Sequence, residues 1–176
     1  MRSFTHCLFV KDNSINSIQT QLRFKEYLEY CRQPSILITS AMNWSEVLKS
    51  IKSEDLCLWT TDTVMPFKEF DKLALTGLKT HDVVMGVRFN RPEWVQMSKG
   101  YSHYLIKKLK ALSIGLMRQL PLRDNSPPCI YLRRTYLELT LKDRMNDSAS
   151  YSEAFIQGLY RQNQSIVHVP IMWHDC

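Results

Sequence analysis

Short apolar runs alternate along the chain with longer stretches in which apolar residues recur every three or four positions. Runs at residues 5–10, 35–39, 55–59, 82–88, 129–132 and 165–172 predict buried strands. The stretches 66–78, 98–120, 135–141 and 151–161 predict helices, and so does the spacing of Ile15, Ile18, Leu22, Leu28 and Cys31 before Pro34. This alternation predicts an α/β domain with a largely parallel sheet.

A capping box marks the start of one more helix. Asn43 is followed three residues later by Glu46, the spacing at which each side chain can bond the other's backbone N–H. The helix that begins there would bury Trp44, Val47, Leu48 and Ile51.

Composition narrows the class of protein. The 176 residues, 44% of them apolar, suit a single domain over residues 1–176 with one core. The five glycines form neither GxGxxG nor GxxxxGK[ST], which excludes the Gly-rich phosphate loops. The five cysteines include no CxxC pair, which argues against a disulfide framework and a zinc site. No apolar run approaches the ~20 residues of a membrane span, so we expect a cytoplasmic protein.

The formal charge of +6 comes from one segment. Between Trp94 and Arg123 there are six bases and no acid, and the remaining 17 bases balance the 17 acids. The six are Lys99, Lys107, Lys108, Lys110, Arg118 and Arg123. Such a patch favours an anionic partner: a phospholipid surface, a lipid phosphate, a nucleotide or a nucleic acid. Nucleic acid ranks last, because few aromatic residues alternate with the bases to stack on nucleotides.

The helix in this segment is amphipathic and has two interpretations. Its leucines form one stripe at Leu105, Leu109, Leu112, Leu116 and Leu120, with Lys107, Lys108 and Lys110 off the stripe. The favoured interpretation packs the leucines on the sheet and leaves the lysines in water. The alternative is peripheral membrane contact, with leucines buried and lysines at anionic headgroups.

Polar residues follow three of the predicted strands. Ligands of open parallel sheets bind beyond the carboxyl ends of the strands. This rule selects Asp62 after the third strand, Arg88 after the fourth, and His174 with Asp175 after the last.

Several motifs follow one another in a recognisable order. They are TTDTVMP at 60–66, DVVMGVR at 82–88, the basic helix, PLRD at 121–124, Arg133-Arg134 and VPIMWHD at 169–175. From about Asn43 to Asp175 the chain resembles family 2 glycosyltransferases of GT-A fold, especially the dolichyl- or polyprenyl-phosphate sugar synthases.

This resemblance implies a Rossmann-related three-layer sandwich with a mostly parallel central sheet. It also implies transfer of a sugar from a nucleotide-sugar donor to polyprenyl phosphate or another anionic acceptor. Asp62, with His174 and Asp175, would hold Mg²⁺ or Mn²⁺, whose preferred ligands are oxygen atoms. Arg88, Arg123, Lys107 and Lys108 would bind phosphates, and Asp124 would orient Arg123 or act as a base.

The chain also departs from the family pattern. Thr60 replaces the first acid of the family's Asp-any-Asp motif, Val64 replaces a later polar residue, and Pro127-Pro128-Cys129 replaces Ser-Gly-Phe. The N-terminal part is one strand-helix unit shorter than the family's, and two copies could pair to cover the surface left open.

Each candidate residue has a structural alternative. Asp62 could cap the following helix, Arg123-Asp124 could form a solvated turn, Arg88 could form a surface ion pair, and His174-Asp175 could fray with the chain end. The alternative function is a catalytically impaired binding or partner subunit with this fold.

Overall fold

The computed structural model describes residues 4–10, 15–31, 34–39, 41–60, 77–87, 95–97, 100–117, 127–162, 165–170 and 173–175. Six strands form one sheet: β1 (Phe4–Phe9), β2 (Ser35–Ile38), β3 (Asp55–Thr60), β4 (Val83–Val87), β6 (Cys129–Arg133) and β7 (Ile166–Pro170). Their order across the sheet is β2-β1-β3-β6-β4-β7. β6 runs antiparallel to both of its neighbours, and the other pairs are parallel.

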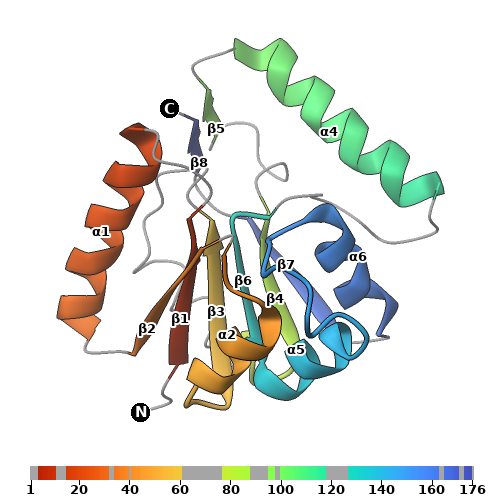
Figure 1. Cartoon of the computed structure of the whole chain (residues 1–176). Helices are drawn as coiled ribbons and strands as arrows, with labels where there is room; N and C mark the ends of the chain where they lie inside the picture. Colours follow the sequence, from red (N-terminus) through yellow and green to blue (C-terminus); the bar gives the residue numbers. More distant parts are fainter. Residues whose placement is uncertain are drawn as a thin grey trace.

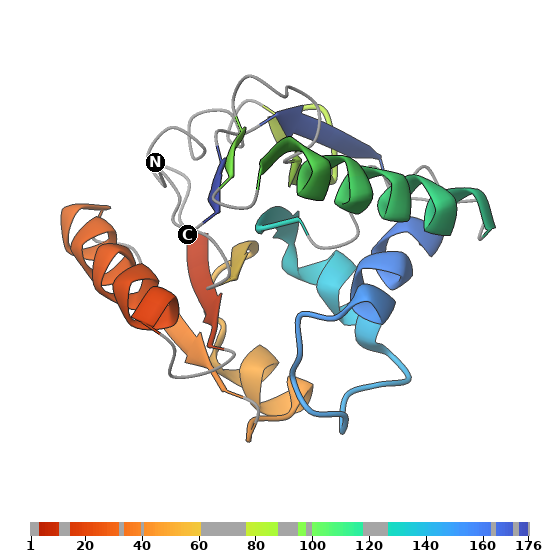
Figure 2. The same ribbon diagram turned by 90° about the horizontal axis from the view of Figure 1, so that it is seen from above.

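Helices cover both faces of this sheet, so the molecule has three layers (Figures 1 and 2). One face packs against α2 (Trp44–Ser50), α5 (Arg134–Leu141) and α6 (Glu153–Arg161). The other face packs against α1 (Ile15–Cys31) through Phe24 and Leu28. The central strands are buried along their whole described length, as expected for strands covered on both sides. The predicted three-layer α/β fold with a mostly parallel sheet is confirmed.

The side chains of the central strands alternate between the two cores. On β3, Leu56 and Leu58 face the α2-α5-α6 side, while Cys57 and Trp59 face the α1 side. This period of two explains why the apolar runs lack polar interruptions, since both directions lead into a core.

The capping box of α2 is present. The Asn43 side chain accepts a hydrogen bond from the Glu46 backbone N–H at 2.9 Å, and the Glu46 carboxylate accepts one from the Asn43 N–H at 3.0 Å. The four residues predicted to be buried by this helix are all in the core. The helix start was therefore predicted correctly, together with the face that it buries.

The helix predicted before Pro34 is present as α1. Ile18 and Leu22 are exposed, at 48% and 55%, whereas Phe24 is buried and Leu28 packs against the same core. Phe24 lies about half a turn away from Leu22, so the apolar spacing indicated the helix without identifying the face that it buries.

The basic helix is α4 (Gly100–Met117), and its favoured interpretation was wrong. Its leucines do not pack on the sheet: Leu109 is 63% exposed and Leu116 is 81% exposed. The helix packs instead through Ala111 and Gly115, which are buried, and through Ile114, which contacts the core of the α2-α5-α6 face. The small residues on this side let the helix approach closely, and the leucines are left outside.

Two short strands were not predicted. β5 (Val95–Met97) and β8 (Trp173–Asp175) form a separate parallel pair above the carboxyl ends of the main strands (Figure 1). The predicted strand at 165–172 is β7 in part, and residues 171–172 lie outside the described residues. Among the helices that the structure describes, none is long and apolar enough to cross a membrane.

Candidate functional site at the carboxyl end of the sheet

The carboxyl ends of five parallel strands and the start of one antiparallel strand meet at one edge of the sheet. β1, β2, β3, β4 and β7 end there, and β6 begins there because its direction is reversed. Two backbone bonds close this edge: Thr60 N–H donates to the Pro128 carbonyl at 3.0 Å, and Val10 N–H donates to the Ile38 carbonyl at 2.9 Å. Backbone hydrogen bonds thus hold neighbouring strand ends together at this edge, and several chain segments leave or enter the sheet there.

Four of the predicted residues lie outside the described part of the chain, but the elements next to them are described. Asp62 comes two residues after the end of β3, and Arg88 directly follows β4. Arg123 and Asp124 precede Pro127 and the start of β6. Because β3, β6 and β4 are consecutive neighbours in the sheet, all three segments are attached to adjacent strand ends at the same edge.

His174 and Asp175 belong to the backbone of β8, which pairs in register with β5. Gln96 is the partner of His174, and Met97 is the partner of Asp175. This pair of strands lies above the same edge (Figure 1). The structural alternative of a frayed chain end is thus wrong for the backbone of these two residues, which forms a strand.

The two lysines proposed for phosphate binding lie in α4, which contacts β5. Lys108 is half-buried. Lys107 is one residue earlier in the same helix. The helix begins beyond β5, above the edge, and runs outward and down over the α6 side of the molecule (Figures 1 and 2).

The described residues at the edge do not form a complete metal site. Thr60 is 7% exposed and occupies the last position of β3, where an acid could have reached the edge. In the part of the chain that the structure describes, no three His, Cys, Asp or Glu side chains come together. Among the described residues at this edge, the candidate metal ligands are those of β8. Whether the site can hold a metal ion therefore depends on Asp62, which lies outside the described residues.

A cluster of aromatic side chains lies in the core next to this edge. Trp59 Nε1 donates to Nδ1 of His6 at 3.1 Å, and Phe4 and Tyr131 pack edge-on against the same group of rings. Burial lowers the pKa of His6 from 6.5 to about 4, so the imidazole is neutral at pH 7. His6 is thus a structural residue, as predicted. Its tie to Trp59 had no signal in the sequence, since the two residues are 53 positions apart.

The cysteines of this cluster are unsuited to nucleophilic chemistry. Cys7, Cys57 and Cys129 are buried free thiols. Burial raises the pKa of Cys7 to about 12, and burial together with the neighbouring Cys129 and Cys7 raises the pKa of Cys57. The thiol forms of Cys7 and Cys57 persist at pH 7, and these two side chains act as small apolar residues.

Arg134, from the Arg-Arg pair of the resemblance, serves the opposite edge of the sheet. Its guanidinium donates to the Ile51 carbonyl at 2.9 Å and to the Glu138 carboxylate at 2.7 Å. Its backbone N–H donates to the Glu54 carbonyl at 2.7 Å. Arg134 thus joins the start of α5 to the loop between α2 and β3.

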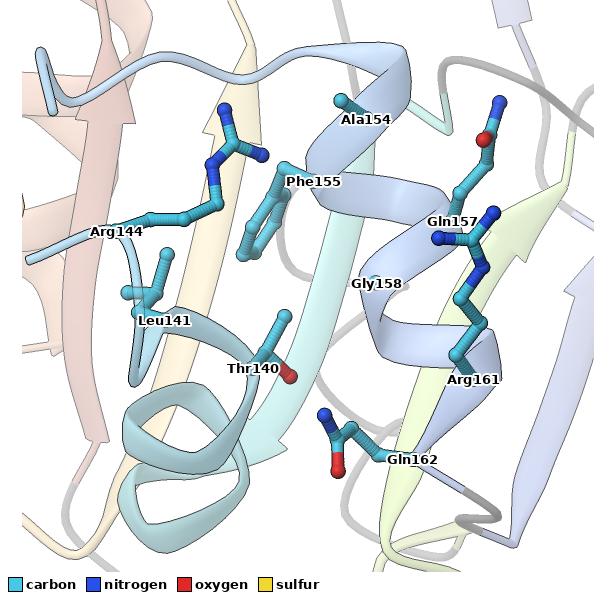
Figure 3. A pocket seen from close by; sticks show the side chains of 9 residues that line it. All are labelled: Thr140, Leu141, Arg144, Ala154, Phe155, Gln157, Gly158, Arg161 and Gln162. Carbon is cyan, nitrogen blue, oxygen red and sulfur yellow. The ribbon is translucent and has the colours of Figure 1, made fainter.

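A groove of about 310 Å³ lies between α5 and α6, away from this edge (Figure 3). Arg144 and Arg161 stand on opposite sides of it (Figure 3). Arg144 pairs with Asp147 at 2.9 Å, and Gln157 donates to Glu153 at 2.9 Å. The polar side chains around this groove are thus partly engaged with neighbours, and the groove holds no set of groups directed at one ligand.

Comparison with known proteins defines the fold. No protein-family model matches the sequence, and no curated protein sequence matches it. Among solved structures, the chain is similar to glucosyl-3-phosphoglycerate synthase from Mycobacterium tuberculosis, in complex with Mn²⁺, UDP and phosphoglyceric acid. That match has a TM-score of 0.54 and 10% identity, and covers 96% of this chain and 68% of that one. The chain has a GT-A-like fold.

Two further structures extend this likeness to nucleotidyltransferase-like folds. The bifunctional IspDF from Campylobacter jejuni matches with a TM-score of 0.52 and 10% identity, over 96% of this chain and 49% of that chain. The 4-diphosphocytidyl-2C-methyl-D-erythritol synthase from Anaerococcus prevotii matches with a TM-score of 0.51 and 8% identity, over 97% and 89%. The chain spans about half the length of IspDF. At these identities the likeness defines the fold alone.

Proposed function

We propose that the chain is a glycosyltransferase that binds a nucleotide-sugar at the carboxyl end of the sheet and transfers the sugar to an anionic acceptor such as polyprenyl phosphate. The main support is the sheet order β3-β6-β4, since it attaches the segments with Asp62, Arg123 and Arg88 to adjacent strand ends. The likeness to a synthase in complex with Mn²⁺ and UDP adds support from the fold.

In this proposal a divalent metal and the basic residues share the work on the diphosphate. Asp62 would hold Mg²⁺ or Mn²⁺, and His174 with Asp175 would supply further ligands from β8. The ion would neutralise the nucleoside diphosphate as it leaves, which is where negative charge develops. Arg88 and Arg123 would bind phosphate oxygens through paired hydrogen bonds.

A phosphate acceptor would need little help from a base. Its oxygen is already an anion at pH 7, so the protein would mainly hold donor and acceptor in line and screen their charges. Lys107 and Lys108, in the middle of α4, would offset the charge of the acceptor. Asp124 would orient Arg123, or act as a base for an acceptor that carries a hydroxyl group.

Calorimetric titration with UDP- and GDP-sugars, with and without Mn²⁺, tests this proposal. We expect Mn²⁺-dependent binding by the wild-type chain and its loss in Asp62→Ala. Asp143→Ala is the matched control, because Asp143 is an exposed carboxylate in the turn after α5. This helix begins where β6 ends, at the opposite edge of the sheet. If no nucleotide-sugar binds, or if both variants lose binding equally, the proposal is wrong.

Thr60 favours a second candidate, a non-catalytic binding or partner subunit. It is buried at the position where the resemblance leads one to expect the first acid of a metal motif. Such a subunit would bind a nucleotide-sugar without consuming it. Release of UDP in the presence of polyprenyl phosphate separates the two: turnover supports the transferase, and binding without turnover supports the subunit.

A further inference from the structure

Between Leu105 and Met117, the outward face of α4 is rich in large apolar side chains. Six of them are exposed, with Leu109 at 63% and Leu116 at 81%. The six are Leu105, Ile106, Leu109, Leu112, Leu116 and Met117. At about 100° per residue they lie within about 140° of the helix circumference, a sector that also contains the exposed Ser113. A large exposed apolar patch of this kind marks a contact with a membrane or another protein.

The opposite face of the same helix is what holds it on the protein. Ala111 and Gly115 are buried, and Ile114 packs against the core of the α2-α5-α6 face. Around the helix, Ala111 and Ile114 lie about 140–160° from Leu109 and Leu116, and Gly115 lies about 100–120° from them. The helix can thus stay attached to the domain while its whole leucine face meets another surface.

The charge of the helix indicates what that surface is. The stretch Gly100–Met117 contains three lysines and no acid. Lys110 is exposed at the border of the apolar face, one residue from Leu109. A long aliphatic stem lets a lysine in this position keep its ammonium group at headgroup level while the neighbouring leucines are buried more deeply. Exposed apolar residues bordered by lysines, on a helix whose own sequence has no acid, match an anionic lipid surface.

We propose that α4 docks this chain on anionic membranes, lying in the plane of the interface with its leucine face in the acyl boundary. The three lysines in the middle of the helix favour this orientation over a transmembrane one, since each would be costly at the bilayer centre. In this orientation the end of the sheet from which β5 and α4 extend lies on the membrane side of the domain (Figure 1).

A second copy of the chain fits the same face less well. Pairing two α4 helices along their leucines would bring the lysines of both close together, and neither helix supplies an acid to compensate. An anionic lipid surface has the opposite sign of charge. The inference does not depend on the proposed transferase activity, because it rests on the exposed apolar face and on Lys110, which the proposed site does not use.

Sedimentation of the full chain with lipid vesicles tests the inference. We expect binding to vesicles of an equimolar mixture of phosphatidylcholine and phosphatidylserine, weaker binding at high salt, and little binding to phosphatidylcholine alone. The double variant L109E/L116E is expected to bind at least about tenfold more weakly. The variant L139E is its control, because Leu139 on α5 is 52% exposed but outside the face.

Charge is tested in the same way with K110E, expected to weaken binding about fivefold or more. Its control is K79E, at the exposed Lys79 in the turn before β4. Hydrogen exchange supplies a second readout: vesicles should protect residues 105–117 in the wild type. The inference is overturned if the wild type ignores anionic vesicles or if the controls lose as much binding as the test variants. A concentration-dependent dimer that L109E/L116E abolishes would instead assign the face to a second copy.

Discussion

The indole Nε1 of Trp59 donates a hydrogen bond to Nδ1 of His6 at 3.1 Å, between two neighbouring parallel strands in the core. The bond requires an unprotonated Nδ1, so it exists only with the neutral imidazole. Trp59 directly precedes Thr60, the last residue of the strand that leads to Asp62. The bond thus ties β1 to β3 within the core, next to the strand end from which the Asp62 segment continues.

This relationship predicts a pH dependence of stability. The pKa of His6 is about 4 in the folded chain, against 6.5 for the free side chain. Because the folded value is the lower one, the unfolded chain binds more protons between these values, and stability rises with pH across that window. The full difference is roughly 3 kcal/mol, present above pH 6.5 and lost as the pH falls toward 4.

Urea unfolding at a series of pH values measures this effect. His6→Gln retains an acceptor for the indole but cannot titrate, so its slope in this window should be much flatter. His81→Gln, in the surface turn before β4, should keep the wild-type slope. An unchanged slope in His6→Gln would contradict the assignment.

A second prediction concerns Gly77, whose missing side chain leaves room for β4. A Cβ at this position would lie 2.7 Å from Cγ2 of Val84 and 3.3 Å from Cγ1 of Val167. Val84 is buried and its β-branched side chain is stiff, so it has no space in which to move. We expect Gly77→Ala to lower the free energy of unfolding by about 1–3 kcal/mol.

Gly158→Ala is the matched control for this change. Its Cβ would meet only Cγ2 of Thr140, at 3.0 Å, from a half-buried position inside α6. Alanine gains about 1 kcal/mol in helix propensity over glycine, which offsets this one tight contact. Urea unfolding should find this variant close to the wild type. Equal losses in both variants would mean that the contact with Val84 is not what makes Gly77 necessary.

The fold was largely predictable because burial on both faces leaves a strong signal. The run that forms β3 carries apolar side chains toward both faces of the sheet, and the capping box of α2 marks the residue at which that helix begins. The antiparallel direction of β6 carries no such signal, since a fully buried strand reads the same in either orientation. β5 and β8 are only three residues long, and their pairing joins segments that are distant in the sequence.

The faces of the helices were harder to predict, for a physical reason. Ala111 and Gly115 are buried, but both residues are small and have low hydrophobicity. Apolar periodicity therefore does not identify the buried face that they form. The leucines of α4 have the stronger pattern and yet lie outside. As for the candidate site, the rule of carboxyl strand ends selected segments that the sheet order does attach to one edge. The roles of the residues in those segments stay predictions.

A third prediction tests whether the segment before β6 takes part in binding. The Tyr151 hydroxyl donates to the Pro127 carbonyl, the first described residue after the Arg123-Asp124 segment. Tyr151→Phe keeps the ring contacts with Phe9 and Phe155 and removes the hydroxyl that makes this bond. We expect a loss of about 1 kcal/mol in stability and a severalfold weaker affinity for nucleotide-sugar.

Tyr160→Phe serves as the comparison. It removes a similar bond, between the Tyr160 hydroxyl and Nε2 of His168 at 2.6 Å, within α6 and β7. Its cost in stability should be similar, while calorimetric titration should find the affinity for nucleotide-sugar unchanged. If both variants bind as well as the wild type, the Pro127 anchor does not position a binding segment.

The fourth prediction restores the acid that the GT-A motif lacks. Thr60 is 7% exposed and its N–H is bonded to Pro128, so an aspartate placed there would be a nearly buried carboxylate at the strand end. Without a counterion, Thr60→Asp should lose roughly 1–3 kcal/mol of stability. If Asp62 lies close enough to share an ion with it, Mn²⁺ should return most of that loss, since an ion that binds only the folded chain stabilises it by RT ln(1 + [Mn²⁺]/Kd). Thr60→Asn separates the effect of charge from that of shape, because asparagine has nearly the same size as aspartate and carries no negative charge to hold the ion.

Thermal unfolding with and without Mn²⁺ measures both variants. We expect Mn²⁺ to raise the midpoint of Thr60→Asp several degrees more than that of Thr60→Asn, and an equal effect on the two would mean that this strand end is not a metal position.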